Sequence, residues 1–384
     1  MAKPSGRSAL SAKPSCYRPR VAIVSRAGNC PFLNFPSGQR MMKHGNELLD
    51  RREFTIGATL GLSLAAGSAV SVPSRVSAFA AATSAPSSAA ARTVRFHDGT
   101  IVPALGQGSW HLAQGRHPAA IEEEALRTGL SLGMTLIDTA ELYEDGRSEE
   151  LIGRVIASQR NRVFLVSKVL PVHVAGDGIA RACEASLARL GTDYLDLYLL
   201  HWRDRDTELA NVVAGFESLR TAGKIRAWGV SNFKVSDMED LFSVPDGHRC
   251  ATNQVRYSLD SRGIERDLLP WCEQRGLPVM AYSPLGGDSG SLVHDPTLAR
   301  IGAMHDCSAA AIALAWAIRS GNVIAIPESG SPVHAKENAV ALSLALTPQE
   351  VQTLDETHPV KPWDIMRSLL DRGRRWLRSF RNTQ

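Results

Sequence analysis

The chain has 384 residues, of which 44% are hydrophobic and 21% charged, the balance of an ordinary globular protein. Its net charge of +4 comes with basic residues gathered near the two ends, which argues against a nucleic-acid-binding surface. Six cysteines form neither a CxxC pair nor a cluster with metal-ligand spacing, so we predict no metal site.

The first 91 residues predict an export segment followed by a linker. Residues 1–46 contain no Asp or Glu and are rich in Arg, Lys, Ser and Pro. A twin-arginine pattern at Arg51 and Arg52 precedes a weakly apolar stretch, residues 56–72, and an Ala-x-Ala cleavage site at residues 78–80. The apolar stretch is shorter than the ~20 residues that span a bilayer, so a cleaved signal is favoured over a membrane anchor.

This interpretation predicts export to the periplasm by the twin-arginine machinery, a route that carries folded proteins and so allows a cofactor to bind before transport. Residues 1–40 are unusual for a bacterial signal. Either translation starts at Met41 or Met42, or the segment is an organellar transit peptide. A cytoplasmic location is the remaining alternative.

The pattern after residue 92 begins with a predicted β-hairpin. Residues 94–97 and 101–102 alternate in polarity and flank Asp98-Gly99, a tight-turn dipeptide. Eight short apolar runs follow, typical of parallel strands that are buried on both faces. They are residues 104–106, 135–139, 163–168, 194–201, 225–231, 251–255, 278–283 and 323–327.

Amphipathic segments between these runs predict helices, among them residues 119–132, 149–158, 178–190, 207–222, 266–274 and 309–320. Eight alternations of strand and helix indicate an α/β fold, a closed (β/α)8 TIM barrel with an N-terminal β-hairpin. The competitor is an open doubly wound sheet, but residues 106–111 lack the third glycine of its dinucleotide fingerprint. The predicted barrel domain covers residues 92–360.

Residues 361–384 form a basic tail with arginines around a few apolar side chains. Three roles are open for it: a cover over the substrate pocket, a contact with an anionic membrane surface, or a solvated helix end.

Polar side chains gather where the predicted strands end, the place at which barrel enzymes carry their functional groups. Asp138, Lys168 and His201 end the second, third and fourth strands, and Tyr143 lies five residues after Asp138. Each alone has a structural alternative, such as turn capping or core packing. Four at one rim, in order, favour a site for proton transfer.

The chemistry of this set suits carbonyl reduction better than acyl transfer, because it contains no nucleophile with a dedicated base. The Lys168 ammonium is expected to lower the pKa of Tyr143, making the phenol a usable acid. Asp138 is expected to pair with Lys168. His201 is expected to donate a hydrogen bond to the carbonyl oxygen.

From residue 94 to residue 358, the sequence motifs resemble those of the aldo-keto reductases in order and in spacing. The matching segments are residues 138–143, 167–168, 199–202, 229–233, 253–254, 281–285, 326–327 and 337–338. Within the family, residues 258–270 and 330–332 look most like bacterial reductases of small dicarbonyls such as methylglyoxal.

The resemblance implies a catalytic tetrad of Asp138, Tyr143, Lys168 and His201, with Tyr143 giving the proton and a nicotinamide the hydride. It also implies that Trp110, Tyr143, His201 and Trp202 line the substrate pocket. For the two tryptophans, ordinary packing within the barrel is the alternative. The implied cofactor site consists of Gly108, Ser109, Trp110, Asp138, Ser231, Asn232, Gln254, Tyr282, Ser283, Pro284, Leu285, Glu328, Ser329, His334, Glu337 and Asn338. Within it, Tyr282 would stack on the nicotinamide ring.

Two positions depart from the family pattern. Many members hold the 2′-phosphate of NADP(H) with a Lys and an Arg where this chain has Glu328 and His334. A carboxylate repels phosphate but accepts hydrogen bonds from the ribose hydroxyls of NAD(H). Alternatively, Glu328 points away and Ser329, Ser331, His334 and Lys336 bind the phosphate. We therefore expect NADP(H), with NAD(H) use as well.

The leading prediction is NAD(P)H-dependent reduction of small aldehydes or ketones by a monomer without a membrane span. One alternative is the reverse reaction, oxidation of a sugar or alcohol. The other is a non-catalytic, cofactor-binding auxiliary subunit, which the intact tetrad disfavours.

Overall fold

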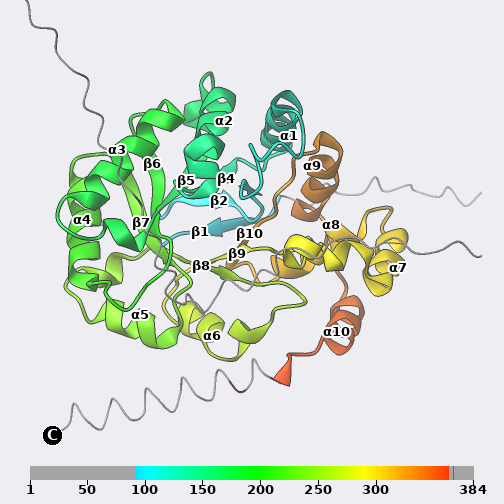
Figure 1. The fold of residues 1–384 in the computed structure, drawn as a ribbon. Helices are drawn as coiled ribbons and strands as arrows, with labels where there is room; N and C mark the ends of the chain where they lie inside the picture. The colour runs from blue at the N-terminus through cyan, green and yellow to red at the C-terminus, as the bar shows by residue number, and fades with distance from the viewer. Residues whose placement is uncertain (1–90, 363–365, 367–384) are drawn as a thin grey trace, which may run out of the picture. The chain divides into compact units, whose positions relative to one another are not determined.

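The computed structural model describes residues 91–362 and residue 366 (Figure 1). The predicted export segment and linker lie outside the described residues except for residue 91, and so does most of the basic tail. Within the described part, no helix has the length and apolar character needed to cross a bilayer.

The described chain begins with the predicted hairpin. Strand β1 (Thr93–Arg95) pairs antiparallel with β2 (Ile101–Pro103). Between them, the Thr100 amide donates to the Asp98 carboxylate at 2.9 Å, and Gly99 adopts a φ of +89°, which glycine tolerates without strain. The hairpin prediction is confirmed.

Eight parallel strands form the centre of the molecule in sequential order, as a TIM barrel requires (Figure 1). They are β3 (Gln107–Gly108), β4 (Leu136–Asp138), β5 (Phe164–Val169), β6 (Leu195–Leu200), β7 (Ile225–Ser231), β8 (Asn253–Arg256), β9 (Val279–Tyr282) and β10 (Val323–Ile326). Seven of the eight strands, all but β3, overlap the predicted apolar runs.

The segment before β3 closes the barrel. We predicted a strand at residues 104–106, and the regular strand is instead the next two residues. Residues 104–106 still pair with β10: Gly106 N donates to Ala325 O at 2.8 Å, and Ala325 N donates to Ala104 O at 2.9 Å. Leu105 therefore lies opposite Ala325 and joins the first strand to the last.

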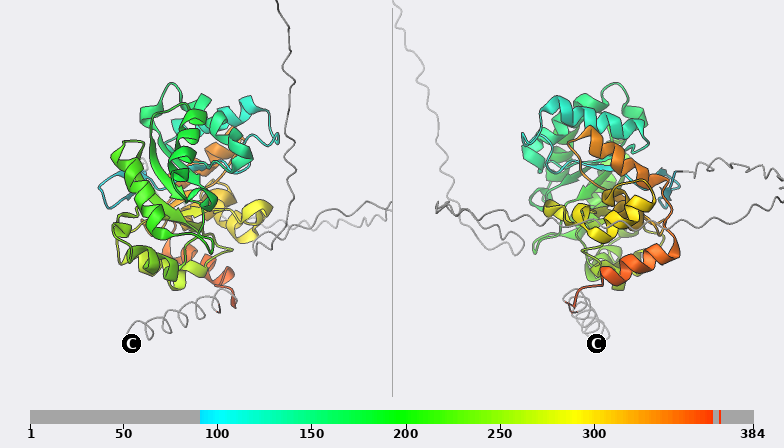
Figure 2. Two further views of the ribbon diagram at one scale, coloured as in Figure 1. Left: turned by 60° about the vertical axis from the view of Figure 1, so that its left-hand side comes forward. Right: turned by 90° about the vertical axis from the view of Figure 1, so that its right-hand side faces the viewer.

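Helices surround the strands in the two views of Figure 2. The helix between successive strands is, in order, α1 (Ala119–Ser131), α2 (Arg147–Ile156), α3 (Gly178–Leu190), α4 (Leu209–Thr221), α5 (Val235–Phe242), α6 (Leu268–Glu273) and α8 (Ala309–Ala317). Helix α9 (Pro332–Ala339) follows β10, and α7 (Pro296–Met304) and α10 (Pro348–Thr357) are additions to the repeat. The predicted (β/α)8 fold class is confirmed.

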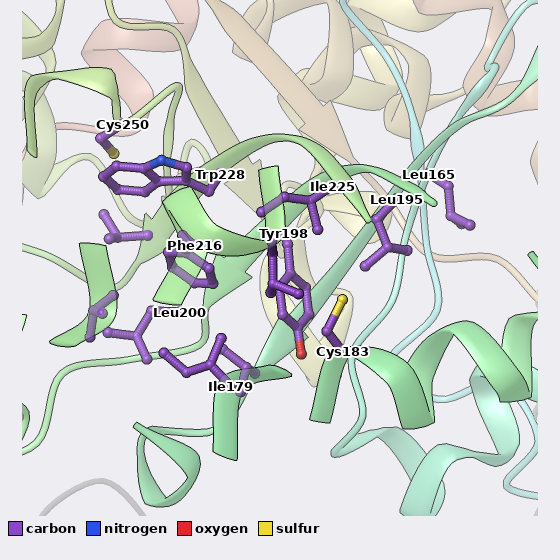
Figure 3. Close-up of a cluster of buried hydrophobic side chains, with 14 of the residues drawn as sticks. Leu165, Ile179, Cys183, Leu195, Tyr198, Leu200, Phe216, Ile225, Trp228 and Cys250 are labelled. Atoms are coloured by element: carbon purple, nitrogen blue, oxygen red, sulfur yellow. The ribbon is translucent and has the colours of Figure 1, made fainter. Parts of the chain in front are cut away.

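Two buried apolar clusters fill the space around the strands. One lies between β5–β8 and helices α2–α6, where Phe216 stacks on Trp228 and meets Tyr198 edge to face (Figure 3). The other joins the hairpin to α8, whose nine residues are all buried. Because these clusters fix the strands on both faces, the residues at the strand ends are held on a rigid frame.

Candidate active site

The strand register places three of the reactive side chains on one face. In a parallel sheet, directly paired residues share a face, and so do residues two apart on one strand. Asp138 pairs with Val166, and Lys168 is two residues further along β5. Lys168 in turn pairs with Leu199, and His201 is two residues further along. Asp138, Lys168 and His201 therefore point to the same side at the barrel mouth.

Lys168 lies at the centre of the site's hydrogen-bond network and is fully buried. Its Nζ donates to Asp138 Oδ2 at 2.7 Å, to the Thr139 carbonyl at 2.8 Å and to the Tyr143 hydroxyl oxygen at 2.9 Å. All three ammonium protons are thus used, which fixes the head group in one place. The expected pairing of Asp138 with Lys168 is present.

Tyr143 enters the site from a short 3-10 turn, Tyr143–Gly146, that separates β4 from α2. Glu144 and Asp145 have φ of +51° and +53°, and Gly146 has +87°. This left-handed run turns the chain back so that the Tyr143 ring is buried against Lys168. Within residues 91–362 the Tyr143 hydroxyl donates to no protein acceptor, so its proton is available to a ligand.

Asp138 is held by two further hydrogen bonds. Its second carboxylate oxygen, Oδ1, accepts from Gln254 Nε2 at 2.7 Å. Its carbonyl oxygen accepts from Ser109 Oγ at 2.9 Å, and Ser148 Oγ in turn donates to the Ser109 carbonyl at 3.1 Å. The carboxylate keeps a fixed geometry because each of its oxygens has a donor.

Burial shifts the pKa values of the ion pair. It raises the pKa of Asp138 and lowers the pKa of Lys168, and in each case the partner's charge opposes the shift. The pair is shielded from water, so its separation would leave an uncompensated charge in the pocket.

The pKa of Tyr143 is shifted in the direction opposite to our expectation. Burial, together with the Asp138 carboxylate, raises the pKa of Tyr143 well above its ordinary value. The predicted lowering by Lys168 was wrong for the ligand-free site, because desolvation of the phenolate is the larger effect. Tyr143 is therefore a neutral phenol at physiological pH, the form that can give up a proton.

His201 completes the set and is also neutral. Burial, reinforced by the Lys168 ammonium, lowers the pKa of His201 well below its ordinary value. Its ring lies 5.8 Å from the Tyr143 ring, and its Nδ1 is buried without a hydrogen-bond partner among the described residues. A neutral imidazole has one N–H to donate, as the sequence prediction requires.

The two predicted tryptophan walls flank these rings. Trp110 meets Tyr143 edge to face at 5.0 Å between ring centroids, and 45% of Trp110 is exposed. Trp202 lies 5.0 Å from the His201 ring. An exposed tryptophan beside a buried tyrosine is unlike core packing and forms an apolar edge of the mouth.

The predicted nicotinamide-side residues form one hydrogen-bonded platform. Asn232 Nδ2 donates to the His201 carbonyl at 3.0 Å, and Tyr282 OH donates to Asn232 Oδ1 at 2.9 Å. Ser231 Oγ donates to the Gln254 carbonyl at 2.8 Å. Asn232 has a φ of +63°, which turns the chain at the strand end.

The predicted pyrophosphate and adenosine residues lie on the loops after β9 and β10. Ser283, with a φ of +51°, begins the first loop, in which Pro284 is buried and Leu285 partly exposed. Ser329 Oγ donates to the Ser331 carbonyl at 2.9 Å just before α9. On α9, His334 is exposed, Glu337 half-buried and Asn338 buried.

Glu328 is engaged by a residue that sequence reasoning missed. Its Oε2 accepts from the His111 backbone N–H at 2.8 Å and lies 2.8 Å from His111 Nδ1. The backbone of Glu328 pairs with Gly108, the first residue of the predicted cofactor loop. The carboxylate is thus turned toward the loop that carries Trp110. No sequence signal indicated this contact.

Among residues 91–362, no group of His, Cys, Asp or Glu side chains is placed to hold a metal ion. The side chains at the mouth provide a phenol, an ammonium, a neutral imidazole and amide groups. This set can polarise and protonate a carbonyl oxygen.

Comparison with known proteins gives the same picture. Residues 104–358 match the Aldo/keto reductase family. The chain is 46% identical to the methylglyoxal reductase YeaE of Escherichia coli over 271 residues, covering 70% of this chain and 95% of that protein. It is 32% identical to the glyoxal reductase of Bacillus subtilis over 266 residues, covering 68% and 91%.

Solved structures are similar as well. A crystal structure of an aldo/keto reductase from Klebsiella pneumoniae, in complex with NADP and acetate, superimposes with a TM-score of 0.67 at 47% identity. The match covers 71% of this chain and 97% of that one. A thermostable aldo-keto reductase, Tm1743, in complex with epalrestat, superimposes with a TM-score of 0.63 at 36% identity, covering 69% and 98%. The chain therefore belongs to the aldo/keto reductase family of oxidoreductases.

Proposed function

We propose that the protein reduces small, uncharged aldehydes and ketones such as methylglyoxal, with NADPH as the hydride donor. The observation that carries this proposal is the contact of the Lys168 ammonium with both Asp138 and the Tyr143 hydroxyl. The similarity to the methylglyoxal reductase of Escherichia coli and to the NADP complex from Klebsiella pneumoniae supports the substrate class and the cofactor.

The residues present fit a nicotinamide. The Asn232 and Gln254 amides and the Ser231 hydroxyl match the hydrogen-bonding groups of a carboxamide, and Tyr282 offers an aromatic ring beside them. When bound, the nicotinamide supplies a hydride to the carbonyl carbon.

The protein's own side chains bind and protonate the carbonyl oxygen of the substrate. The substrate oxygen accepts hydrogen bonds from the Tyr143 hydroxyl and the neutral His201 ring, which hold it and draw electron density toward it. Tyr143 transfers its proton to that oxygen as the alkoxide charge develops. The Lys168 ammonium, 2.9 Å from the phenol oxygen, stabilises the phenolate that is left. Asp138 keeps Lys168 in position throughout.

The cofactor preference follows from the position of Glu328. We propose that NADP(H) is used and NAD(H) is accepted as well. Because His111 engages the Glu328 carboxylate, Ser329, Ser331, His334 and Lys336 can receive a 2′-phosphate on the α9 side. The remaining negative charge nearby weakens phosphate binding and leaves NADH competitive.

Steady-state kinetics test both statements. Full-length protein is assayed with methylglyoxal and with NADPH or NADH, and the reverse reaction with sugars and alcohols and the oxidised cofactors. We expect higher kcat/KM for carbonyl reduction than for alcohol oxidation at neutral pH. A preference for NADPH above about a thousandfold would contradict the dual use. Tight binding without turnover of any carbonyl would point to an auxiliary role.

We also propose export through the twin-arginine route, on the basis of Arg51, Arg52 and the Ala-x-Ala site alone. Cell fractionation of a bacterial host that expresses the full chain is the test. Periplasmic protein that disappears from that fraction in the double variant Arg51→Lys/Arg52→Lys would support the proposal. Equal distribution of the two proteins would refute it.

A further inference from the structure

Glu149 is a fully buried carboxylate that the proposed reaction does not use. It lies in the first turn of α2 with no exposed surface. Its Oε1 accepts from Ser167 Oγ at 2.6 Å, and its Oε2 accepts from Arg189 Nε at 2.6 Å. Burying a carboxylate costs free energy unless the charge is paired. A carboxylate that is retained at a fully buried position therefore calls for a functional explanation.

The contact with Ser167 places Glu149 directly behind the catalytic strand. Ser167 precedes Lys168 on β5, and successive side chains of a strand point to opposite faces. Lys168 faces the mouth while Ser167 faces α2. Glu149 therefore binds β5 from the outside at the residue next to the one that carries the ammonium.

Arg189 extends the same contact to the segment that carries Tyr143. It reaches from the end of α3 and packs over Gly146, where a β-carbon would collide with the Arg189 side chain. Gly146 is the last residue of the left-handed turn that begins at Tyr143. Glu149 is thus bonded to Ser167 on one side of the Tyr143–Lys168 contact and, on the other side, to Arg189, which packs against Gly146.

The charges around Lys168 come from both faces of β5. In the mouth its side chain faces Asp138, Tyr143 and His201, and the Glu149 carboxylate lies behind the strand, where it acts on Lys168 only through its charge. Burial lowers the pKa of Lys168, whereas the Asp138 and Glu149 carboxylates oppose that shift. The groups that surround Glu149 itself are Arg189, Ser167, Glu141, Tyr198 and Cys183.

We propose that Glu149 is a positioning residue for the active site, which holds the part of β5 that carries Lys168 through its bond to Ser167 and, through Arg189, supports the turn that follows Tyr143. This inference rests on the proposed function only in assuming that Lys168 supports proton donation by Tyr143. The charge on Lys168 can be measured without any substrate.

The test compares Glu149→Gln with Glu150→Gln, a neighbour on the same helix whose side chain is exposed. Glutamine keeps the shape of Glu149 and removes its charge. The full chain contains only eight lysines, Lys3, Lys13, Lys43, Lys168, Lys224, Lys234, Lys336 and Lys361, so carbon-13-labelled lysine resolves them by NMR. We expect the pKa of Lys168 to be lower in Glu149→Gln and unchanged in Glu150→Gln. An unchanged value in Glu149→Gln would overturn the proposal.

Kinetics supply the second measurement. In Glu149→Gln, kcat should fall about tenfold, with its alkaline decline moved to lower pH, while the Kd for NADPH stays within twofold. A wild-type pH profile would overturn the proposal, whereas a wild-type protein that reduces no carbonyl would overturn the proposed function instead. If Glu149→Gln does not fold, Ser167→Ala decides: lower kcat with an unchanged Kd for NADPH supports the proposal, and wild-type kcat overturns it.

Discussion

The two sides of the barrel mouth are built in different ways. On the β4–β6 side, Asp138, Tyr143 and Lys168 are buried and joined by short hydrogen bonds. On the β9–β10 side, Ser283 and Glu328 lie on loops and His334 lies on α9, and all three are partly or fully exposed. The residues of the proposed proton transfer are thus fixed by burial and hydrogen bonds, whereas the residues of the proposed nucleotide selection lie at the surface, where substitutions cost little.

The largest effect that this comparison predicts concerns the buried side. Tyr143→Phe removes the only proposed proton donor, so kcat should fall by about 10²–10⁴ while the Kd for NADPH changes less than twofold. The control is Tyr194→Phe, because Tyr194 lies before β6 at the opposite end of the barrel, between Arg160 and Arg226. Steady-state kinetics and fluorescence titration measure both quantities. Near-normal turnover by Tyr143→Phe would show that the proton donor is misassigned.

The second prediction concerns the stability of the same side. Lys168→Met leaves the Asp138 carboxylate buried without its partner, so the free energy of unfolding should fall by about 3 kcal/mol or more. Lys224→Met, on a partly exposed lysine, should change it by less than about 0.5 kcal/mol. Urea unfolding followed by circular dichroism measures the difference. Equal stability of the two variants would mean that the ion pair is not held as tightly as its geometry indicates.

The third prediction concerns the exposed side. Glu328→Lys removes the negative charge next to the proposed phosphate site and adds a positive one, so the ratio of kcat/KM for NADPH to that for NADH should rise about tenfold or more. Glu356→Lys, on an exposed residue of α10, makes the same change in net charge away from the mouth and should leave the ratio unaltered. A similar rise in both variants would assign the effect to overall charge.

The smallest expected effect follows from His201. Burial lowers its pKa in the folded protein, so below about pH 6.5 the unfolded chain binds a proton that the folded chain does not. Stability is therefore retained above this pH and lost as the pH falls. Thermal melts at pH 8 and pH 5.5 should show a smaller acid-induced loss for His201→Gln than for the wild type. An equal loss in the two proteins would contradict a buried neutral imidazole.

The buried side was predictable from the sequence because strand periodicity dictates it. Once Asp138, Lys168 and His201 are placed at the ends of successive parallel strands, their side chains must converge. Tyr143 was also placed at the mouth, and the Asp145-Gly146 dipeptide marks a turn there, but it does not indicate that Glu144 is left-handed as well. The sign of its pKa shift was not predictable, because it depends on how completely the ring is buried.

The exposed side was predictable only as a set of positions. The sequence shows that Glu328 replaces a lysine, but not that His111 engages its carboxylate from another loop. Glu149 was missed for a related reason. Its partners Ser167 and Arg189 are 18 and 40 residues away in the chain, and only the packing of α2 and α3 against β5 brings them together. Contacts between different elements depend on packing that periodicity does not report.

The central claim is that the barrel binds a reduced nicotinamide and uses it to reduce a carbonyl. The most direct measurement is a fluorescence titration of the full chain with NADPH, and separately with NADH, followed by addition of methylglyoxal to the same sample. We expect saturable binding of both nucleotides and then loss of the reduced-nicotinamide signal. Absence of binding by either nucleotide would contradict it.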